Sequence, residues 1–400
     1  MYGIVLEGGG ARGAYQIGVW KALRELGVEF DAVAGTSVGA LNGAMMIQDD
    51  FGKALEIWTE ITPSKVINLD ESVYEEIKNY DFTFKNGQNI LKQVKLIIKE
   101  GGLDISPLRQ LLNQYIDENR IRKSGKLFGI VAASLPDLSH SEFFLEDIPE
   151  GKLIDYLIAS ANLPVFKLDR LDGKLFLDGG FYNNLPINML EAKGYKNIIA
   201  VRLNSFSLKK KVNEDELNLI YLKPSESLGA LLDFSNKKAQ RNILVGYYDA
   251  QRVFKKYKGR KYYLEIDKPE DYFFNLFLRL EGGKLDRFFA EFNIPSPLSQ
   301  RRYIFEKLVP MLADLLGVKE GSYEDIALAL LERTAEKMGI ERLRVFKWDE
   351  LYDQVVKIYS SSQNDSVFKR IIQLLPNDFM LKTAKAQVLD RIAELLFGIP

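Results

Sequence analysis

The sequence predicts an α/β fold with a mostly parallel central sheet, followed by an all-α C-terminal domain. In the first half, short apolar runs of β type alternate with helical patterns, as is typical of a parallel sheet with crossover helices. Beyond about Asp267 the β-type alternation disappears and one helical period follows another. A chain of 400 residues is long enough for two domains. We therefore predict a first domain over residues 1–260 and a helical domain over residues 267–400.

The predicted strands are short runs rich in apolar and β-branched residues. The first two, Ile4–Leu6 and Ala32–Ala34, each lead into a turn that contains glycine. The others are Phe128–Ala133, Leu175–Leu177, Asn197–Leu203 and, as a last strand or extended segment, Tyr262–Ile266.

Helical periods lie between and after these runs. Ala14–Leu26 places its apolar residues on one face and ends at Gly27, a residue suited to the position after a helix. Ser106–Tyr115 begins with Ser-Pro, which predicts an N-cap followed by proline at the first helical position. Ser235–Tyr257 predicts a long helix, and the charged stretch Lys209–Asp215 predicts a loop outside the sheet. The C-terminal helical periods fall on residues 272–280, 302–317, 323–339, 351–359, 367–375 and 386–398, and they share no repeat signature.

Composition excludes several classes of protein. The 54 Lys and Arg residues nearly balance the 55 Asp and Glu residues, so neither a basic nucleic-acid-binding protein nor a disordered acidic one is indicated. Without cysteine there is no disulfide, thiolate nucleophile or Cys-based zinc site. The N-terminus lacks the pattern of a secretory signal, and no apolar stretch approaches the ~18–20 residues that span a bilayer. We expect a cytoplasmic protein that can touch membranes peripherally.

A glycine-rich loop follows the first predicted strand. Gly8, Gly10 and Gly13 in "EGGGARG" satisfy the Gly-x-Gly-x-x-Gly spacing of dinucleotide-binding folds, but no acidic residue stands where a ribose would need one. A P-loop would need Lys and then Ser or Thr after the last glycine, where this chain has Ala14 and Tyr15. Adjacent glycines also let backbone N–H groups converge at a helix N-terminus, which suits an oxyanion. The simpler alternative is a glycine turn that only allows tight packing of helix on strand.

One strand and one helix later, "GTSVG" places Ser37 between Gly35 and Gly39 at an equivalent strand-to-helix turn. Adjacent parallel strands bring both loops to the same edge of the sheet, where the N–H of Val38 would complete an oxyanion hole. By itself the motif is compatible with an N-cap serine at the start of a helix. The two motifs together are far more specific than either one alone.

A nucleophilic serine needs a base, and the chain has a single histidine, His140, in a polar loop. A lone loop histidine is more often a surface residue, and His140 would also need an acid such as Asp104. A carboxylate can accept the proton directly, and Asp178, which ends the run Leu175–Leu177 before Gly179 and Gly180, is the best candidate. Asp-Gly is also a strong turn signal, so an ordinary turn remains the alternative here.

Four motifs in this order resemble the patatin-like phospholipase family: "GGGARG", "GTSVG", "ASANLPVF" over Ala159–Phe166, and "DGG". The resemblance covers residues 1–205, and softer similarity continues to about residue 260. It implies a three-layer α/β/α core and a lipid acyl hydrolase with a Ser–Asp dyad and no metal in the chemical step. On the family's pattern Ser37 is the nucleophile and Asp178 the base, while Gly8, Gly9, Gly10 and Arg12 form the oxyanion-hole loop. Gly180 stands where many relatives carry alanine.

The substrate predicted from this resemblance is a phospholipid or another lipid ester, without a cofactor. Phospholipase A, lysophospholipase, neutral-lipid lipase and small-ester esterase activities all remain open. The stretches Tyr247–Tyr263 and Tyr272–Leu280 are candidates for membrane contact, although a solvated basic helix and a buried core helix are the stronger interpretations. Other hypotheses are a phosphate- or nucleotide-binding protein that uses the glycine loop, and a non-catalytic lipid-binding protein. The helical domain can cap the site, mediate self-association or bind a regulator.

Overall fold

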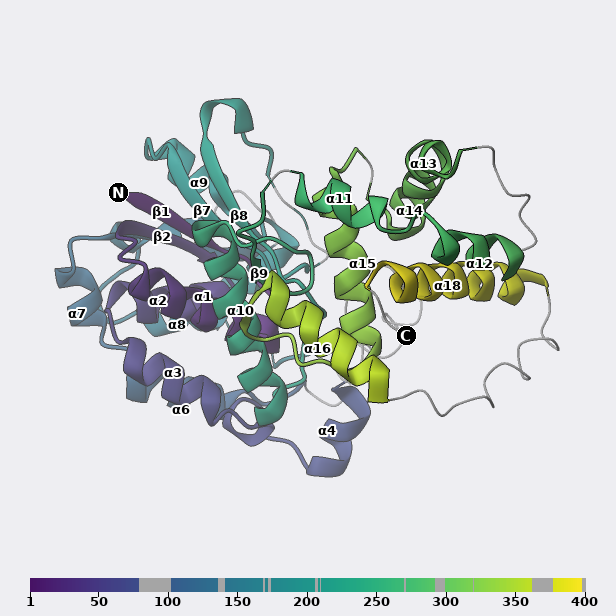
Figure 1. The fold of residues 1–400 in the computed structure, drawn as a ribbon. Helices are drawn as coiled ribbons and strands as arrows, with labels where there is room; N and C mark the ends of the chain where they lie inside the picture. The colour runs from purple at the N-terminus through teal and green to yellow at the C-terminus, as the bar shows by residue number, and fades with distance from the viewer. Residues whose placement is uncertain are drawn as a thin grey trace. The chain divides into compact units, whose positions relative to one another are not determined.

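The computed structural model shows two compact units, Met1–Lys255 and Lys256–Pro400 (Figure 1). It describes residues 1–78, 102–135, 141–167, 170–171, 174–205, 208, 210–269, 271–291, 299–318, 320–361 and 377–397. His140 and the helix predicted over residues 367–375 lie outside the described residues. Each unit has its own hydrophobic core.

The first unit is built on an eight-stranded mixed sheet in the order β5-β6-β3-β2-β1-β7-β8, with β4 paired to β3. The strands β3, β2, β1, β7 and β8 run parallel to one another. β4 and β6 pair antiparallel with β3, and β5 pairs antiparallel with β6. The predicted α/β class with a mostly parallel sheet is confirmed. The strands are β1 Tyr2–Leu6, β2 Phe30–Thr36, β3 Leu127–Leu135, β4 Glu142–Phe144, β5 Arg170–Leu171, β6 Lys174–Asp178, β7 Asn197–Val201 and β8 Asn218–Leu222.

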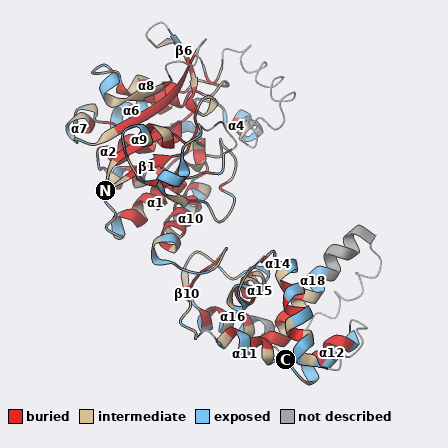
Figure 2. Ribbon diagram, turned by 90° about the horizontal axis from the view of Figure 1, so that it is seen from above, coloured by how far each residue is buried: buried red, intermediate tan, exposed pale blue. Residues whose placement is uncertain are grey.

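Helices cover both faces of this sheet, so the predicted three layers are confirmed. Gly43, in α2 (Val38–Ile47), faces Leu6, Val33 and Phe128. The alternate strand residues, including Val5, Ala34 and Ile198, form a cluster with α9 (Ile187–Ala192). Because successive strand residues point to opposite faces, α2 and α9 lie on opposite sides of the sheet. Figure 2 shows the strands buried between these layers.

The remaining helices of this unit are α1 Ala14–Glu25, α3 Phe51–Thr59, α4 Glu71–Ile77, α6 Ser106–Tyr115, α7 Glu118–Lys123, α8 Leu153–Ser160 and α10 Asn236–Lys255. The three helices predicted in this unit all form. One detail differs, because Ser106 is the first residue of α6 and not its N-cap. The carboxylate of Asp104 instead accepts hydrogen bonds from the Ser106 N–H at 2.9 Å and hydroxyl at 3.0 Å. A carboxylate near the N-terminus of a helix stabilises the helix, so Asp104 takes the role that the sequence pattern predicts for Ser106.

Two glycines let α1 and α10 approach each other at backbone distance. A Cβ on Gly18 would overlap the Ile243 carbonyl, and one on Gly246 would overlap the Tyr15 carbonyl. Only glycine leaves room for such a contact. It fixes α1, and therefore the glycine loop at its N-terminus, against a helix more than 200 residues later in the chain.

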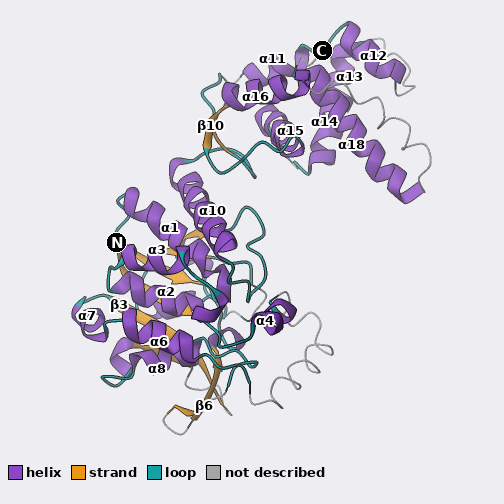
Figure 3. Ribbon diagram, turned by 90° about the horizontal axis from the view of Figure 1, so that it is seen from below, coloured by secondary structure: helices purple, strands orange, loops and turns teal. Residues whose placement is uncertain are grey.

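The second unit consists mainly of helices, as Figure 3 shows. Its elements are β9 Tyr263–Glu265, α11 Tyr272–Leu278, α12 Gly283–Glu291, α13 Gln300–Tyr303, a π-helical stretch Ile304–Leu308, α14 Val309–Leu316, α15 Tyr323–Lys337, β10 Val345–Lys347, α16 Trp348–Ser361 and α18 Asn377–Leu396. The predicted helical C-terminal region is confirmed. The short strand β10, which pairs in parallel with β9, was not predicted, because three residues are too few to show an alternation.

The core of the second unit is aromatic and holds one buried carboxylate. Trp348 is almost fully buried, and in the apolar stretch 272–280 so are Phe273, Leu276, Phe277 and Leu280, whereas Phe274 is 37% exposed. Glu332 accepts hydrogen bonds from three successive backbone N–H groups, those of Arg260, Lys261 and Tyr262. Several N–H donors on one carboxylate offset the cost of burying it and fix the start of this unit.

Candidate active site

The glycine loop and Ser37 lie at the same edge of the sheet because they follow two adjacent parallel strands. β1 and β2 pair in register with Leu6 opposite Gly35, so both strands end together. Gly8 then lies directly beside the serine, since a Cβ on Gly8 would be 3.1 Å from the Ser37 Cβ and 3.1 Å from the Thr36 carbonyl oxygen. This geometry agrees with the expectation from the sequence that the glycine loop and the Ser37 turn meet at one edge of the sheet.

Ser37 occupies a sharp turn with a backbone conformation that L-residues rarely adopt, at φ 54° and ψ −128°. Its N–H donates to the Ser160 hydroxyl oxygen at 2.9 Å, and that hydroxyl donates to the Val131 carbonyl at 2.6 Å. Two residues after Ser37, glycine is required at position 39, because a Cβ on Gly39 would overlap the Leu6 carbonyl. Although Ser37 precedes α2, its hydroxyl makes no capping hydrogen bond to the described helix. Ser37 thus occupies the N-cap position of α2, but capping by its hydroxyl does not account for a serine there.

Asp178 is the last residue of β6 and reaches Ser37 from the antiparallel side of β3. Its N–H donates to the Asn162 carbonyl at 2.7 Å, and its Oδ1 accepts from the Gly180 N–H at 2.8 Å. Gly179 allows this turn to sit on β3, since a Cβ there would overlap the Val131 carbonyl. Asp178 thus does form the turn that Asp-Gly predicts, but its carboxylate is also 4% exposed and faces the serine.

Burial raises the pKa of Asp178 to about 6, while hydrogen bonding from the Ser37 hydroxyl and from the Gly180 N–H lowers it in part. Within the described chain, Oδ2 of Asp178 makes no hydrogen bond of ordinary length and angle. The Ser37 hydroxyl is near enough to this carboxylate to lower its pKa; proton transfer to it needs a hydrogen bond of ~2.6–3.2 Å. Such contacts commonly tighten when substrate binds. At neutral pH the carboxylate is ionised and can accept a proton.

The amides of the glycine loop divide into two groups. The Gly8 N–H donates to the Asn184 carbonyl at 3.2 Å, and the Ala11 N–H donates to the Leu231 carbonyl at 2.8 Å. Among the described residues, no hydrogen bond engages the N–H groups of Gly9, Gly10 or Val38. Gly10 has φ +53°, in the left-handed region that favours glycine. The available donors near Ser37 are thus the amides that follow Gly8 and the first amide of α2.

Arg12 steadies this loop. Its Nε donates to the Gly229 carbonyl at 2.9 Å, and its side chain is half-buried. Together with the bond from Ala11 to Leu231, this contact ties the loop to a segment more than 200 residues downstream. Of the two roles considered for Arg12, a side chain that fixes the loop agrees with the structure better than one that faces solvent.

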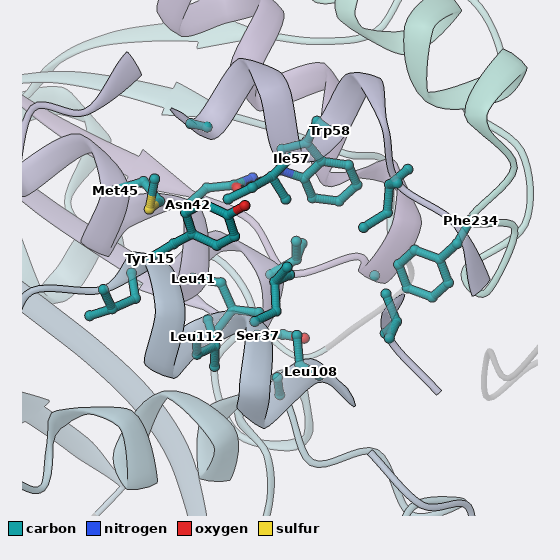
Figure 4. Close-up of a pocket in the computed structure, with 18 of the residues that line it drawn as sticks. Ser37, Leu41, Asn42, Met45, Ile57, Trp58, Leu108, Leu112, Tyr115 and Phe234 are labelled. Atoms are coloured by element: carbon teal, nitrogen blue, oxygen red, sulfur yellow. Dashed lines mark hydrogen bonds between the residues drawn. The ribbon is translucent and has the colours of Figure 1, made fainter. Parts of the chain in front are cut away.

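An apolar pocket opens beside Ser37, with an empty volume of about 840 Å³ including the part open to solvent (Figure 4). Its walls come from α2, α3, α6 and the segments around residues 161–166 and 232–234. The lining residues are Gly10, Ser37, Val38, Leu41, Asn42, Met45, Ala54, Ile57, Trp58, Ile61, Val66, Leu108, Leu111, Leu112, Tyr115, Ile116, Ala161, Leu163, Phe166, Leu232 and Phe234. No sequence pattern predicts that these residues form a pocket wall. The amphipathic pattern of Phe51–Thr59 was the signal available for it, but that pattern cannot show which side a helix turns toward a site.

Other residues considered from the sequence lie elsewhere. Asp104 does not line the pocket of Ser37, and hydrogen bonds from the Ser106 N–H and from Asn68 lower its pKa. His140 lies outside the described residues. Within the basic and aromatic stretch 247–263, the Tyr247 hydroxyl donates to Glu25 at 2.7 Å, and Tyr262 and Tyr263 are buried. In the described parts of the chain, no helix is long and apolar enough to span a membrane.

An α/β unit with a serine on a strained strand-to-helix turn, beside unengaged backbone amides and an apolar pocket, has the architecture of serine hydrolases. The comparison with known families agrees. Residues 4–191 match the patatin-like phospholipase family model, so this segment of the chain is similar to that family.

Individual relatives give the same result. The chain is 28% identical over 209 residues to patatin-like phospholipase domain-containing protein 7 of Rattus norvegicus, which is 50% of this chain and 13% of that protein. It is 57% identical over 47 residues to lysophospholipase nte1 of Aspergillus terreus, which is 12% of this chain and 3% of that protein. The chain thus spans a small fraction of the length of the curated relatives that it matches. A structural neighbour is VipD from Legionella pneumophila, with a TM-score of 0.41, 15% identity, and coverage of 100% of this chain and 90% of that one.

Proposed function

We propose that this protein is a serine lipid acyl hydrolase that cleaves carboxylic esters of lipids, with Ser37 as nucleophile and Asp178 as base. The observation that carries the proposal is a buried carboxylate facing the hydroxyl of a strained serine at the head of an apolar pocket. A turn that served only the fold would not need to bury an acid beside a nucleophile. The match of residues 4–191 to the patatin-like phospholipase family model supports the same chemistry.

In the proposed mechanism, Ser37 Oγ attacks the ester carbonyl carbon while its proton passes to Asp178. The tetrahedral intermediate collapses, the ester C–O bond breaks, and the alcohol leaves with the proton that Asp178 returns. Water then attacks the acyl-enzyme, again losing a proton to Asp178, and the fatty acid is released as Ser37 recovers its proton.

The oxyanion of each intermediate would be held by the amides of Gly9, Gly10 and Val38. These three N–H groups are unengaged in the described chain, whereas that of Gly8 is already bonded to Asn184. We therefore assign to Gly8 the role of bringing the loop against Ser37, and to Arg12 that of fixing its position. Removing one donor of this kind typically slows a reaction ~10²–10³-fold.

The pocket supports a long acyl chain as the part of the substrate that is recognised. Almost all of its lining is aliphatic or aromatic, so a fatty-acyl chain would be desolvated there with its carbonyl at Ser37. We propose phospholipids or lysophospholipids as the substrate class, in agreement with the name of the Aspergillus terreus relative. A cytoplasmic location with peripheral membrane contact, and the domain assignment to residues 1–260 and 267–400, remain predictions.

A fluorophosphonate probe and a defined lipid panel test the proposal. The probe should label wild-type protein at Ser37 and should leave Ser37→Ala unlabelled. Release of fatty acid from diacyl phospholipid, lysophospholipid, triacylglycerol and a short ester then identifies the bond that is cut. His140→Ala should retain the wild-type rate, and Asp178→Asn should lose it. Folded wild-type protein that is neither labelled nor active would favour a non-catalytic lipid-binding protein, and saturable nucleotide binding would favour the phosphate-binding alternative.

A further inference from the structure

One polar side chain stands out in the wall of the apolar pocket. Asn42 lies in α2, is 3% exposed, and is among the residues that line the pocket beside Ser37 (Figure 4). A buried amide without partners destabilises the fold, and an aliphatic residue would suit a fatty-acyl chain better. The partners of this amide explain why it is there.

The Asn42 amide uses both of its donors and its acceptor on three different elements. Nδ2 donates to the Gly13 carbonyl at 3.0 Å and to Gln16 Oε1 at 2.8 Å. Oδ1 accepts from Trp58 Nε1 at 2.9 Å. Gln16, which is 1% exposed and does not line the pocket, in turn donates from Nε2 to the Glu7 carbonyl at 2.7 Å.

Glu7 and Gly13 are the residues at the two ends of the glycine loop. The network therefore holds the carbonyl just before Gly8 and the carbonyl that closes the loop, and it leaves the N–H groups of Gly9 and Gly10 without a hydrogen bond in the described chain. The indole ring of Trp58 packs against Gly13, since a Cβ on Gly13 would be 2.9 Å from a carbon of that ring. The ring thus forms part of the pocket wall and at the same time fixes the orientation of the Asn42 amide.

We infer that Asn42 is a positioning residue for the oxyanion hole. Through Gln16 and Gly13 it sets where the amides of Gly9 and Gly10 point, and Trp58 holds it in that orientation from the pocket side. This inference rests on the proposed function, because it concerns the loop that would bind the oxyanion. Displacing a catalytic group by about 1 Å can cost ~10²-fold in rate, so a network that fixes both ends of the glycine loop affects kcat directly.

Two substitutions separate the network from the pocket. Gln16→Met keeps the length of the side chain and removes the bond to Glu7 without touching the pocket. Trp58→Phe keeps an aromatic ring in the wall and removes the N–H that holds Asn42. If Asn42 positions the loop, both variants lower kcat about 10- to 100-fold on a short p-nitrophenyl ester that does not fill the pocket, while KM changes less than about threefold. The rate of phosphonylation of Ser37 by a small fluorophosphonate should fall in parallel.

The control is Ile198→Ala, a core truncation in β7 on the opposite face of the sheet. It should lower the melting temperature as much as the network variants do and leave kcat per titrated serine unchanged. Network variants that lose stability but keep kcat and the phosphonylation rate would overturn the inference, as would variants that change only KM for long-chain esters. Wild-type protein that is neither labelled nor active would overturn the proposed function itself, and the inference with it.

Discussion

Replacing Asp178 by asparagine is expected to make the first unit more stable and the protein inactive. The two side chains have the same shape, so packing is retained. Oδ1 can still accept from the Gly180 N–H, and the new Nδ2 faces the Ser37 hydroxyl oxygen, which can accept from it. What the substitution removes is a charge that the folded protein buries.

The size of the effect follows from the pKa of Asp178, which burial raises from 3.8 to about 6. A rise of ~2 units at ~1.4 kcal/mol per unit corresponds to ~3 kcal/mol. The sign is destabilising for the ionised form. Between about pH 4 and 6 the folded state binds more protons than the unfolded state, so wild-type stability falls as pH rises through this range. Above about pH 6 the full cost is present, and Asp178→Asn does not have it.

Urea unfolding of the full chain at several pH values measures this difference. The variant should exceed the wild type by ~3 kcal/mol at pH 8, and the advantage should disappear at about pH 4. Asp104→Asn is the matched control, because the pKa of that exposed carboxyl is lowered by hydrogen bonds and its replacement should not stabilise the protein at any pH. An Asp178→Asn variant that is no more stable than wild type at pH 8, or whose advantage does not depend on pH, would refute the account of a buried, ionised base.

The remaining predictions concern activity, local support and packing. Hydrolysis should decline below about pH 6 with a single ionisation, because protonated Asp178 cannot act as a base; a profile of kcat/KM from pH 4.5 to 9 that stays flat would contradict this. Ser160→Ala removes the acceptor for the Ser37 N–H and should lower kcat about tenfold or more, as steady-state assays on a soluble ester would show. Gly246→Ala places a Cβ against the Tyr15 carbonyl and should destabilise the first unit by at least ~1–3 kcal/mol in calorimetry. Glu332→Gln should lower the stability of the second unit by ~1–3 kcal/mol while esterase activity is unchanged.

Local patterns are sufficient to predict the strands that carry the candidate site and the helices α1, α6 and α10, but not the bounds of α2 and α3, which line the pocket. β1, β2, β3 and β6 each extend the predicted run by one or two residues at one or both ends, where apolar patterning gives way to hydrogen bonding that a sequence does not display. The meeting of the glycine loop with Ser37 also followed from the sequence, because two consecutive strands joined by a helix pair in parallel.

The approach of Asp178 to Ser37 could not be derived in this way. It depends on β6 pairing antiparallel to β3, and neither the apolar run 175–177 nor the Asp-Gly turn specifies a neighbour or a direction. Only the resemblance of four motifs to a family supplied it. The use of the Gly8 amide by Asn184 and the pocket wall formed by Trp58 are likewise contacts between distant segments, which a single sequence does not encode in any local pattern.

The bonds from Arg12 to Gly229 and from Ala11 to Leu231 have a consequence for synthesis of the chain. The segment that matches the family model ends at residue 191, so it does not include residues 229 and 231, whose carbonyls accept these bonds from the glycine loop. A nascent chain would therefore contain Ser37 well before residues 229 and 231 are available to hold the glycine loop. A truncated chain that ends at residue 225 should accordingly resist phosphonylation, and brisk labelling of it would show that the loop assembles unaided.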